Sequence, residues 1–123
     1  MIIKVIKMYE DVVLPDYVKD QDAGFDIRSY ETVTINPMEC KVISTGLKMS
    51  IPNLWELQIR SRSGLSANYQ VFVLNSPGTV DSGYLDEVKI ILFNAGQNAY
   101  TVNKGDRIAQ GVVAECKRAL FQT

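Results

Sequence analysis

Short apolar segments that alternate with polar residues constrain the fold of this chain most. In segment 55–61, every second residue from Trp55 to Ile59 is apolar, which is the two-residue period of a half-buried strand. Helical periodicity is not sustained anywhere, and residues 63–69 are the only helical candidate. The pattern predicts an all-β domain, a jelly-roll-like barrel or sandwich with at most one short helix. The other expected strands are at 2–6, 32–35, 40–51 with an interruption at Gly46, 71–74, 88–92, 99–102 and 107–114. Residues 22–27 are expected to form a loop that enters a strand.

Length and charge limit the class of protein. The 123 residues suffice for one core, expected as a β domain over 1–114 with a C-terminal tail over 115–123. Hydrophobic residues make up 46% and charged residues 22%, as in globular domains. The net charge of −1 gives no broad attraction to nucleic acid or membranes, so neither is an expected partner. The sequence lacks a long apolar stretch and a signal-peptide pattern, which predicts a cytoplasmic location.

The absence of histidine restricts the chemistry. It removes Ser-His and Cys-His nucleophile pairs and histidine zinc sites. Cys40 and Cys116 stand far apart, which excludes the ligand set of a zinc-dependent deaminase. We expect two buried thiols, with a disulfide as the alternative. Carboxylates, amides, hydroxyls, arginines or a hard cation must carry any reaction.

The stretch 74–94 contains the densest set of turn and polar residues. Apolar strands on both sides indicate a long hairpin whose loop presents Asp81 and Tyr84. Gly78 and Gly83 permit a ligand to approach the backbone closely. An ordinary solvated turn has the same composition, so the loop by itself leaves both interpretations open.

Three further stretches carry groups suited to binding phosphate or a metal ion. Arg62 and Ser63 stand where a strand gives way to the possible helix, a place that attracts phosphate oxygens, although a capped turn has the same residues. Asp106 could orient an arginine, and Gln110 offers a donor and an acceptor. Asp26 could hold a water on a magnesium ion, or bond to its own turn.

The order of these stretches resembles the trimeric-type deoxyuridine triphosphatases (dUTPases). The matching segments are 23–27 (Ala-Gly-Phe-Asp-Ile), 62–65 (Arg-Ser-Gly-Leu), 78–84 (Gly-Thr-Val-Asp-Ser-Gly-Tyr, preceded by 74–77) and 105–110 (Gly-Asp-Arg-Ile-Ala-Gln). We refer to them as the first to fourth motifs. The resemblance extends from about residue 2 to residue 114.

The resemblance implies Mg²⁺-dependent hydrolysis of dUTP to dUMP and pyrophosphate. Asp81 would hold and deprotonate the attacking water, and Gln110 would help to place it. Asp106 would orient Arg62, and Asp26 would bind magnesium through a water. The implied phosphate-binding residues are Arg62, Ser63, Gly64 and Gln110, and the implied uracil and deoxyribose residues are Asn75, Gly78, Thr79, Val80, Asp81 and Tyr84. A homotrimer with active sites shared between subunits is also implied.

Two departures keep alternatives open. Leu85-Asp86 stands where the family has Arg-Gly, and the residues after Gly111 contain no glycine-rich fifth motif. Arg118 and Phe121 could replace part of that closing arm, or the tail could pack on the trimer. The alternatives are a dCTP deaminase-like protein, with Glu87 as the nearest candidate base, and a non-catalytic relative that binds dUTP or a partner.

Overall fold

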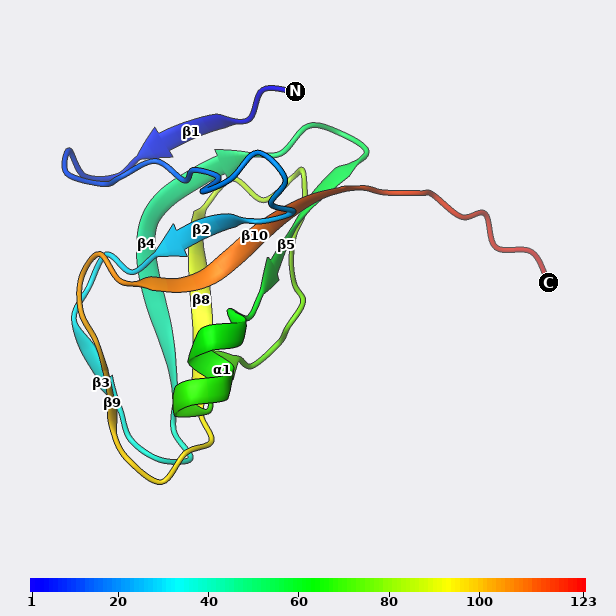
Figure 1. Cartoon of the computed structure of the whole chain (residues 1–123). Coiled ribbons are helices and arrows are strands. Elements are labelled where there is room, and N and C mark those ends of the chain that lie inside the picture. The colour runs from blue at the N-terminus through cyan, green and yellow to red at the C-terminus, as the bar shows by residue number, and fades with distance from the viewer.

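The computed structural model describes all residues, 1–123, as ten strands and one helix (Figure 1). The predicted helix forms over the expected residues. The elements are β1 (Lys4–Lys7), β2 (Phe25–Arg28), β3 (Val33–Ile35), β4 (Cys40–Ser50), β5 (Trp55–Arg60), α1 (Ser63–Tyr69), β6 (Val71–Val73), β7 (Gly78–Val80), β8 (Glu87–Asn94), β9 (Tyr100–Val102) and β10 (Arg107–Glu115). With seven residues, the helix is too short to cross a membrane.

The strands form two four-stranded sheets and a two-stranded ribbon. The first sheet has the order β1-β4-β8-β6, the second has the order β2-β10-β5-β7, and β3 pairs with β9. Every pairing is antiparallel. The prediction of an all-β fold is confirmed. Because both large sheets keep two open edges, the fold is a sandwich and not a closed barrel.

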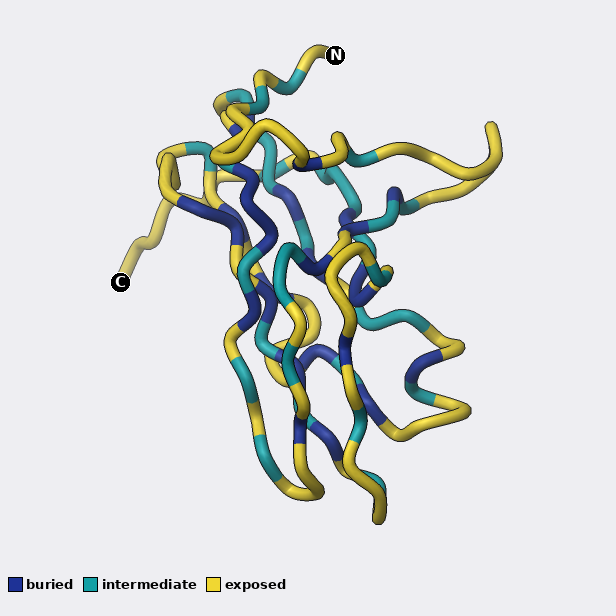
Figure 2. Tube along the Cα trace, turned by 90° about the vertical axis from the view of Figure 1, so that its left-hand side faces the viewer, coloured by how far each residue is buried: buried dark blue, intermediate teal, exposed yellow.

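Buried apolar side chains alternate with more exposed residues along the strands, and the buried ones form the core between the sheets (Figure 2). Ile43 of β4 faces Ile90 of β8 in the register, and both side chains are completely buried. Leu57 of β5 is completely buried in the opposite sheet. Burying an aliphatic side chain of this size stabilises a fold by about 1.5–3 kcal/mol. These core strands hold the loops that carry the polar motifs.

The expected interruption at Gly46 is a bulge within one continuous strand. The register between β4 and β8 shifts between Ser44 and Lys48, and Gly46 has a φ of +73°. The Gly46 N–H donates to the buried carboxylate of Glu87 at 2.9 Å. A bulge with a left-handed glycine lets the strand bend without losing its pairing on either side.

Replacing Gly46 with alanine should lower the free energy of unfolding by about 2–4 kcal/mol. A Cβ there would lie 2.7 Å from Cγ2 of Val12, and the left-handed φ disfavours any side chain. Urea denaturation measures the effect. Gly83→Ala is the control, because a Cβ at Gly83 meets nothing within 4 Å. Equal stability of the two variants would contradict the role assigned to the bulge.

The expected hairpin is present, but the segment that connects its two strands contains a further strand, β7. Strands β6 and β8 pair antiparallel, with Val73 opposite Leu92, as the sequence predicts. Between them the chain crosses to the second sheet, where β7 pairs with β5 and places Gly78 opposite Ile59. The residues of β7, Gly-Thr-Val, stand within a stretch rich in turn residues, so local preference favours a loop there. The crossing places Asp81 at the end of a strand in the second sheet.

The chain leaves the body of the domain after β10 (Figure 1). Leu120 and Phe121 are almost fully exposed there. Both cysteines are free thiols, as expected, but Cys40 is exposed and Cys116 is half-buried, so the expectation that both are buried is wrong. Burial raises the pKa of the Cys116 thiol, and the nearby Glu56 carboxylate raises it further.

Candidate functional site

Three of the four motifs line one polar cleft, which we call the phosphate cleft. The loop before β2 supplies one wall, and the residues at the start of α1 and the strand β10 supply the others. The volume of the cleft is about 510 Å³, and only two of its residues are apolar. The lining residues are Val18, Lys19, Asp22, Ala23, Gly24, Asp26, Arg62, Ser63, Gly64, Arg107 and Gln110.

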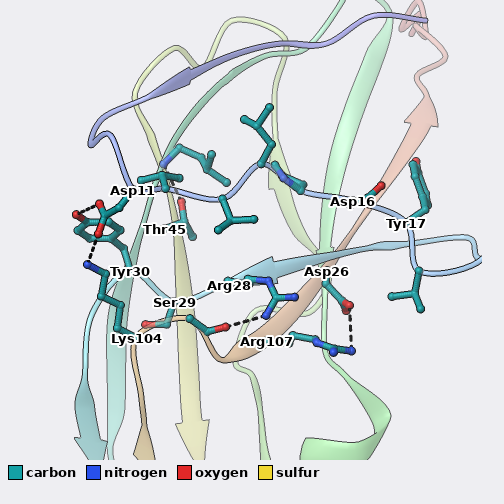
Figure 3. A pocket seen from close by; sticks show the side chains of 17 residues that line it. Asp11, Asp16, Tyr17, Asp26, Arg28, Ser29, Tyr30, Thr45, Lys104 and Arg107 are labelled. Carbon is teal, nitrogen blue, oxygen red and sulfur yellow. Dashed lines mark hydrogen bonds and ion pairs between the residues drawn. The ribbon is translucent and has the colours of Figure 1, made fainter.

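Asp26 organises the positive charge of the phosphate cleft. Its carboxylate lies 3.5 Å from Nε of Arg62 and 3.6 Å from Nη1 of Arg107, and Figure 3 shows its pairing with Arg107. Nη1 of Arg62 also donates to the carbonyl of Arg107 at 3.3 Å. These contacts connect the first, second and fourth motifs.

The carboxylate partner of Arg62 differs from the one that the resemblance implied. Asp106 was expected to orient Arg62, but its carboxylate instead accepts the backbone N–H of Asn103 at 2.8 Å and closes the turn before β10. The structure therefore shows Asp26 as the residue that pairs with Arg62. The reason is topological, because β10 lies between β2 and β5. Gln110 is opposite Asp26 on one side and opposite Arg60, two residues before Arg62, on the other.

A bulge in β10 brings two side chains of the fourth motif to the same side. The register with β2 shifts between Arg107 and Ala109, and Ile108 and Ala109 are consecutive buried residues. In a regular strand, Arg107 and Gln110 would point to opposite faces, since side chains alternate. With the bulge, both line the phosphate cleft.

The amide of Gln110 is positioned by two contacts. Its Nε2 donates to the carbonyl of Ser61 at 3.0 Å. Gly24 packs against the other end of the amide, so that a Cβ at Gly24 would lie 2.5 Å from Oε1 of Gln110. The glycine of the first motif is thus required for close approach to the fourth.

Several residues of the phosphate cleft were not expected from the sequence. Lys19, Asp22, Gly24 and Arg107 line it but were not candidate site residues. For Gly24 and Arg107 the available signal was their place within the motifs. For Lys19 and Asp22, which lie in an irregular loop, the sequence contains no local signal that marks them.

The third motif lies elsewhere in the same chain. Strand β5 separates it from β10, because Arg60 pairs with Gln110 whereas Leu57 pairs with Val80. Asp81, the next residue, is therefore offset from Gln110 by four residues, about 13 Å along the strand direction. That distance exceeds hydrogen-bond reach, and Asp81 does not line the phosphate cleft.

The candidate uracil-binding residues gather around β7. The amide of Asn75 packs on Gly78, where a Cβ would lie 3.2 Å from Nδ2. Thr79 is exposed between the buried residues Gly78 and Val80. The hydroxyl of Tyr84 donates to the carbonyl of Glu87 at 2.5 Å, which fixes the end of the segment on β8.

A second cavity of about 300 Å³ lies beside the phosphate cleft and shares Asp26 and Arg107 with it (Figure 3). On its rim, Nζ of Lys104 and the hydroxyl of Tyr30 each lie 2.6 Å from the carboxylate of Asp11. The bond from Lys104 and the bond from Tyr30 lower the pKa of Asp11 to about 2. This cluster secures the turn that precedes β10.

Replacing Asp11 with asparagine should reduce stability at neutral pH, and most of that reduction should be gone at pH 2. Because the folded-state pKa of Asp11 is depressed, its contribution is present above the ordinary value of 3.8 and is lost as the pH falls toward 2. Urea denaturation midpoints between pH 6 and pH 2 measure this. The exposed Asp20→Asn serves as the control. A difference from wild type that stays constant across this range would contradict the assignment.

Sequence comparisons match this chain to a known protein family. The dUTPase family model matches residues 10–123. A deoxyuridine 5'-triphosphate nucleotidohydrolase of Crocosphaera subtropica is 45% identical over 122 residues, covering 99% of this chain and 86% of the relative. One of Helicobacter pylori strain P12 is 45% identical over 121 residues, covering 98% of this chain and 83% of the relative.

Solved structures extend the similarity to the whole fold. A mutant dUTPase from phage phi11 of S. aureus, described with a structural Mg(II) ion, matches with a TM-score of 0.92 and 26% identity over 100% of this chain and 96% of that one. The dUTPase of Staphylococcus bacteriophage 80alpha with dUPNHPP matches with a TM-score of 0.91 and 26% identity over 99% and 87%. The match to the family model and the 45% identity to a relative over nearly the whole chain show that the chain belongs to the dUTPase family.

Proposed function

We propose that this chain hydrolyses dUTP to dUMP and pyrophosphate. The observation that carries the proposal is the convergence of the first, second and fourth motifs in one polar cleft, in a member of the dUTPase family. The arginines Arg62 and Arg107 and the polar groups of Ser63 and Gln110 are suited to a triphosphate.

Asp81 acts as the general base in the proposed reaction. It accepts a proton from a water whose oxygen forms a bond to the α-phosphorus, while the bond from that phosphorus to the bridging oxygen breaks. Pyrophosphate leaves with the electron pair of that bond. Ser63 donates to the bridging oxygen, Gln110 helps to place the water, and Arg62 with the backbone at Gly64 holds the phosphates.

Magnesium enters the proposal as part of the substrate complex. The chain contains no cluster of three carboxylate, cysteine or histidine side chains that could hold a metal ion, so the ion would be carried mainly by the triphosphate. Asp26 lines the cleft and its carboxylate is suited to accept hydrogen bonds from a water on the ion. When bound, the ion neutralises phosphate charge.

The segment around β7 reads the uracil in this proposal. Strand β7 lies at the edge of the second sheet, so one row of its backbone N–H and C=O groups is free of strand partners. Gly78, Thr79 and Val80 can therefore pair with the polar edge of a base, with Asn75 beside them and Tyr84 against the deoxyribose. A base that leaves those groups unpaired is discriminated against strongly.

A second copy must complete the site. The offset between Asp81 and Gln110 prevents one chain from bringing both to the same phosphorus. The outer face of the first sheet carries an apolar patch, with Phe72 and Phe93 in edge contact at 5.7 Å between ring centroids. The patch consists of Cys40, Val42, Phe72, Leu74, Ile91 and Phe93, which the strand registers place side by side. Exposed patches of this kind mark protein interfaces.

We therefore propose a homotrimer with an active site at each subunit boundary. Each site would combine the phosphate cleft of one copy with Asp81 and the uracil-binding residues of another. The apolar patch supports self-association, and the phage relatives are dUTPases that bind a dUTP analogue. The free thiols suit a reducing compartment, which supports the cytoplasm as the site of action.

A substrate panel tests the function. Assaying dUTP, dCTP, dTTP and UTP with Mg²⁺, and measuring pyrophosphate and ammonia, should show pyrophosphate release from dUTP alone. Ammonia from dCTP would support the deaminase alternative. Glu87, its nearest candidate base, is buried and accepts the N–H of Gly46 at 2.9 Å, which disfavours that role. Binding of dUTP without turnover would contradict the proposal and support a non-catalytic role.

A further inference from the structure

The loop before β2 adds a lysine to the phosphate cleft. Lys19 lines the cleft, is exposed, and takes part in none of the ion pairs of the chain. The other two cations of the cleft, Arg62 and Arg107, are both paired with Asp26. Lys19 is therefore the one cation of the cleft without a carboxylate partner.

The remaining carboxylate of the cleft is engaged by the backbone. Oδ2 of Asp22 accepts the backbone N–H of Lys19 at 3.0 Å, and the N–H of Asp22 donates to the carbonyl of Lys19 at 3.1 Å. These two bonds close a tight turn that begins at Lys19. The ammonium of Lys19 forms no ion pair with Asp22 and is available to an anion.

The same loop ends in contact with the reacting centre of the proposed mechanism. Gly24 packs on the amide of Gln110, which helps to place the attacking water in the proposed reaction. Lys19 lies five residues earlier, at the other end of the loop segment that lines the cleft. Lys19, Ser63 and Gln110 line the same cleft, so a triphosphate whose α-phosphate is held by Ser63 and Gln110 has its outer phosphates in the cleft that Lys19 also lines.

We propose that Lys19 binds the β- and γ-phosphates of the substrate, the group that leaves as pyrophosphate. The inference rests on the proposed hydrolysis of dUTP. A lysine ammonium is a compact charge on a flexible stem, suited to a phosphate group that moves as its bond breaks. As negative charge accumulates on the leaving pyrophosphate, the interaction strengthens and stabilises the transition state.

Product inhibition distinguishes the role of Lys19. Lys19→Met should lower kcat/KM for dUTP about tenfold and raise the inhibition constant of inorganic pyrophosphate by a similar factor, as expected for one lost hydrogen bond between charged groups. The inhibition constant of dUMP should stay within about twofold, because dUMP lacks the outer phosphates. Lys19→Arg should retain most of the wild-type affinity for pyrophosphate, since it keeps the charge.

Lys4→Met is the matched control. Lys4 is an exposed lysine of β1 in the first sheet, without an ion pair, and its loss should leave both inhibition constants unchanged. An unchanged constant for pyrophosphate in Lys19→Met, or an equal rise for dUMP, would overturn the assignment.

Direct binding separates this inference from the proposed function. If the wild-type protein does not release pyrophosphate from dUTP, the proposed function is wrong, but the assignment of Lys19 as a phosphate ligand is still to be tested. Calorimetric titration of inorganic pyrophosphate into wild type and Lys19→Met then tests the lysine. Weaker binding by the variant supports Lys19 as a phosphate ligand, and equal binding rejects it.

Discussion

Asp81→Asn should lower kcat for dUTP by about 10³-fold, within the range expected when a general base is removed. The asparagine has nearly the same shape but cannot accept the proton of the attacking water. Asp81 is exposed and its carboxylate makes no hydrogen bond within the chain, so the free energy of unfolding should not change. Stopped assays of pyrophosphate release and urea denaturation measure the two quantities.

Glu10→Gln is the control for Asp81→Asn. It also removes one exposed carboxylate, outside both cavities and the β7 segment, and should retain full activity. A kcat of Asp81→Asn within threefold of wild type would remove Asp81 from the mechanism and with it the main step of the proposal.

Mixing two inactive variants tests whether sites are shared. An equal mixture of Asp81→Asn and Gln110→Ala, unfolded and refolded together, should recover activity at about a quarter of the sites if each site combines two copies of the chain at random. Each variant refolded alone should stay inactive. No recovery in the mixture, with assemblies of the expected size, would show that Asp81 and Gln110 do not act from different copies.

Gly24→Ala should lower kcat by about 10²-fold while leaving stability nearly unchanged. The added Cβ would lie 2.5 Å from Oε1 of Gln110, the far end of a flexible side chain, so the amide can turn away at little structural cost. A misplacement of about 1 Å at a reacting centre can nevertheless cost about 10²-fold in rate. Kinetics and denaturation of the same preparation measure the effect.

Gly111→Ala provides the contrast in the same sheet. A Cβ there would lie 2.6 Å from ring carbons of Phe25 and 3.0 Å from Cδ1 of Leu57, which are held in the core. Overpacking of this kind costs about 1–3 kcal/mol of folding free energy. If Gly24→Ala instead loses stability and keeps its rate, the contact with Gln110 has no functional role.

Local features of the sequence determined most of the secondary structure. The alternation around Leu57 and the polar stretch before Leu65 depend only on neighbouring residues, so the strands and the helix α1 could be predicted at nearly their observed positions. The order of the motifs indicated the family for the same reason. A motif is a local pattern, so it can be recognised in the sequence without knowledge of the fold.

Tertiary structure alone decided how those residues meet. The transfer of β7 to the second sheet, the bulge that turns Arg107 and Gln110 to one side, and the pairing of Arg62 with Asp26 all depend on strand neighbours distant in the sequence. The ammonium of Lys19 likewise has no carboxylate partner, because Asp26 pairs with Arg62 and Arg107. Strand order and register fix these contacts, and both arise from packing of the whole core rather than from any local preference.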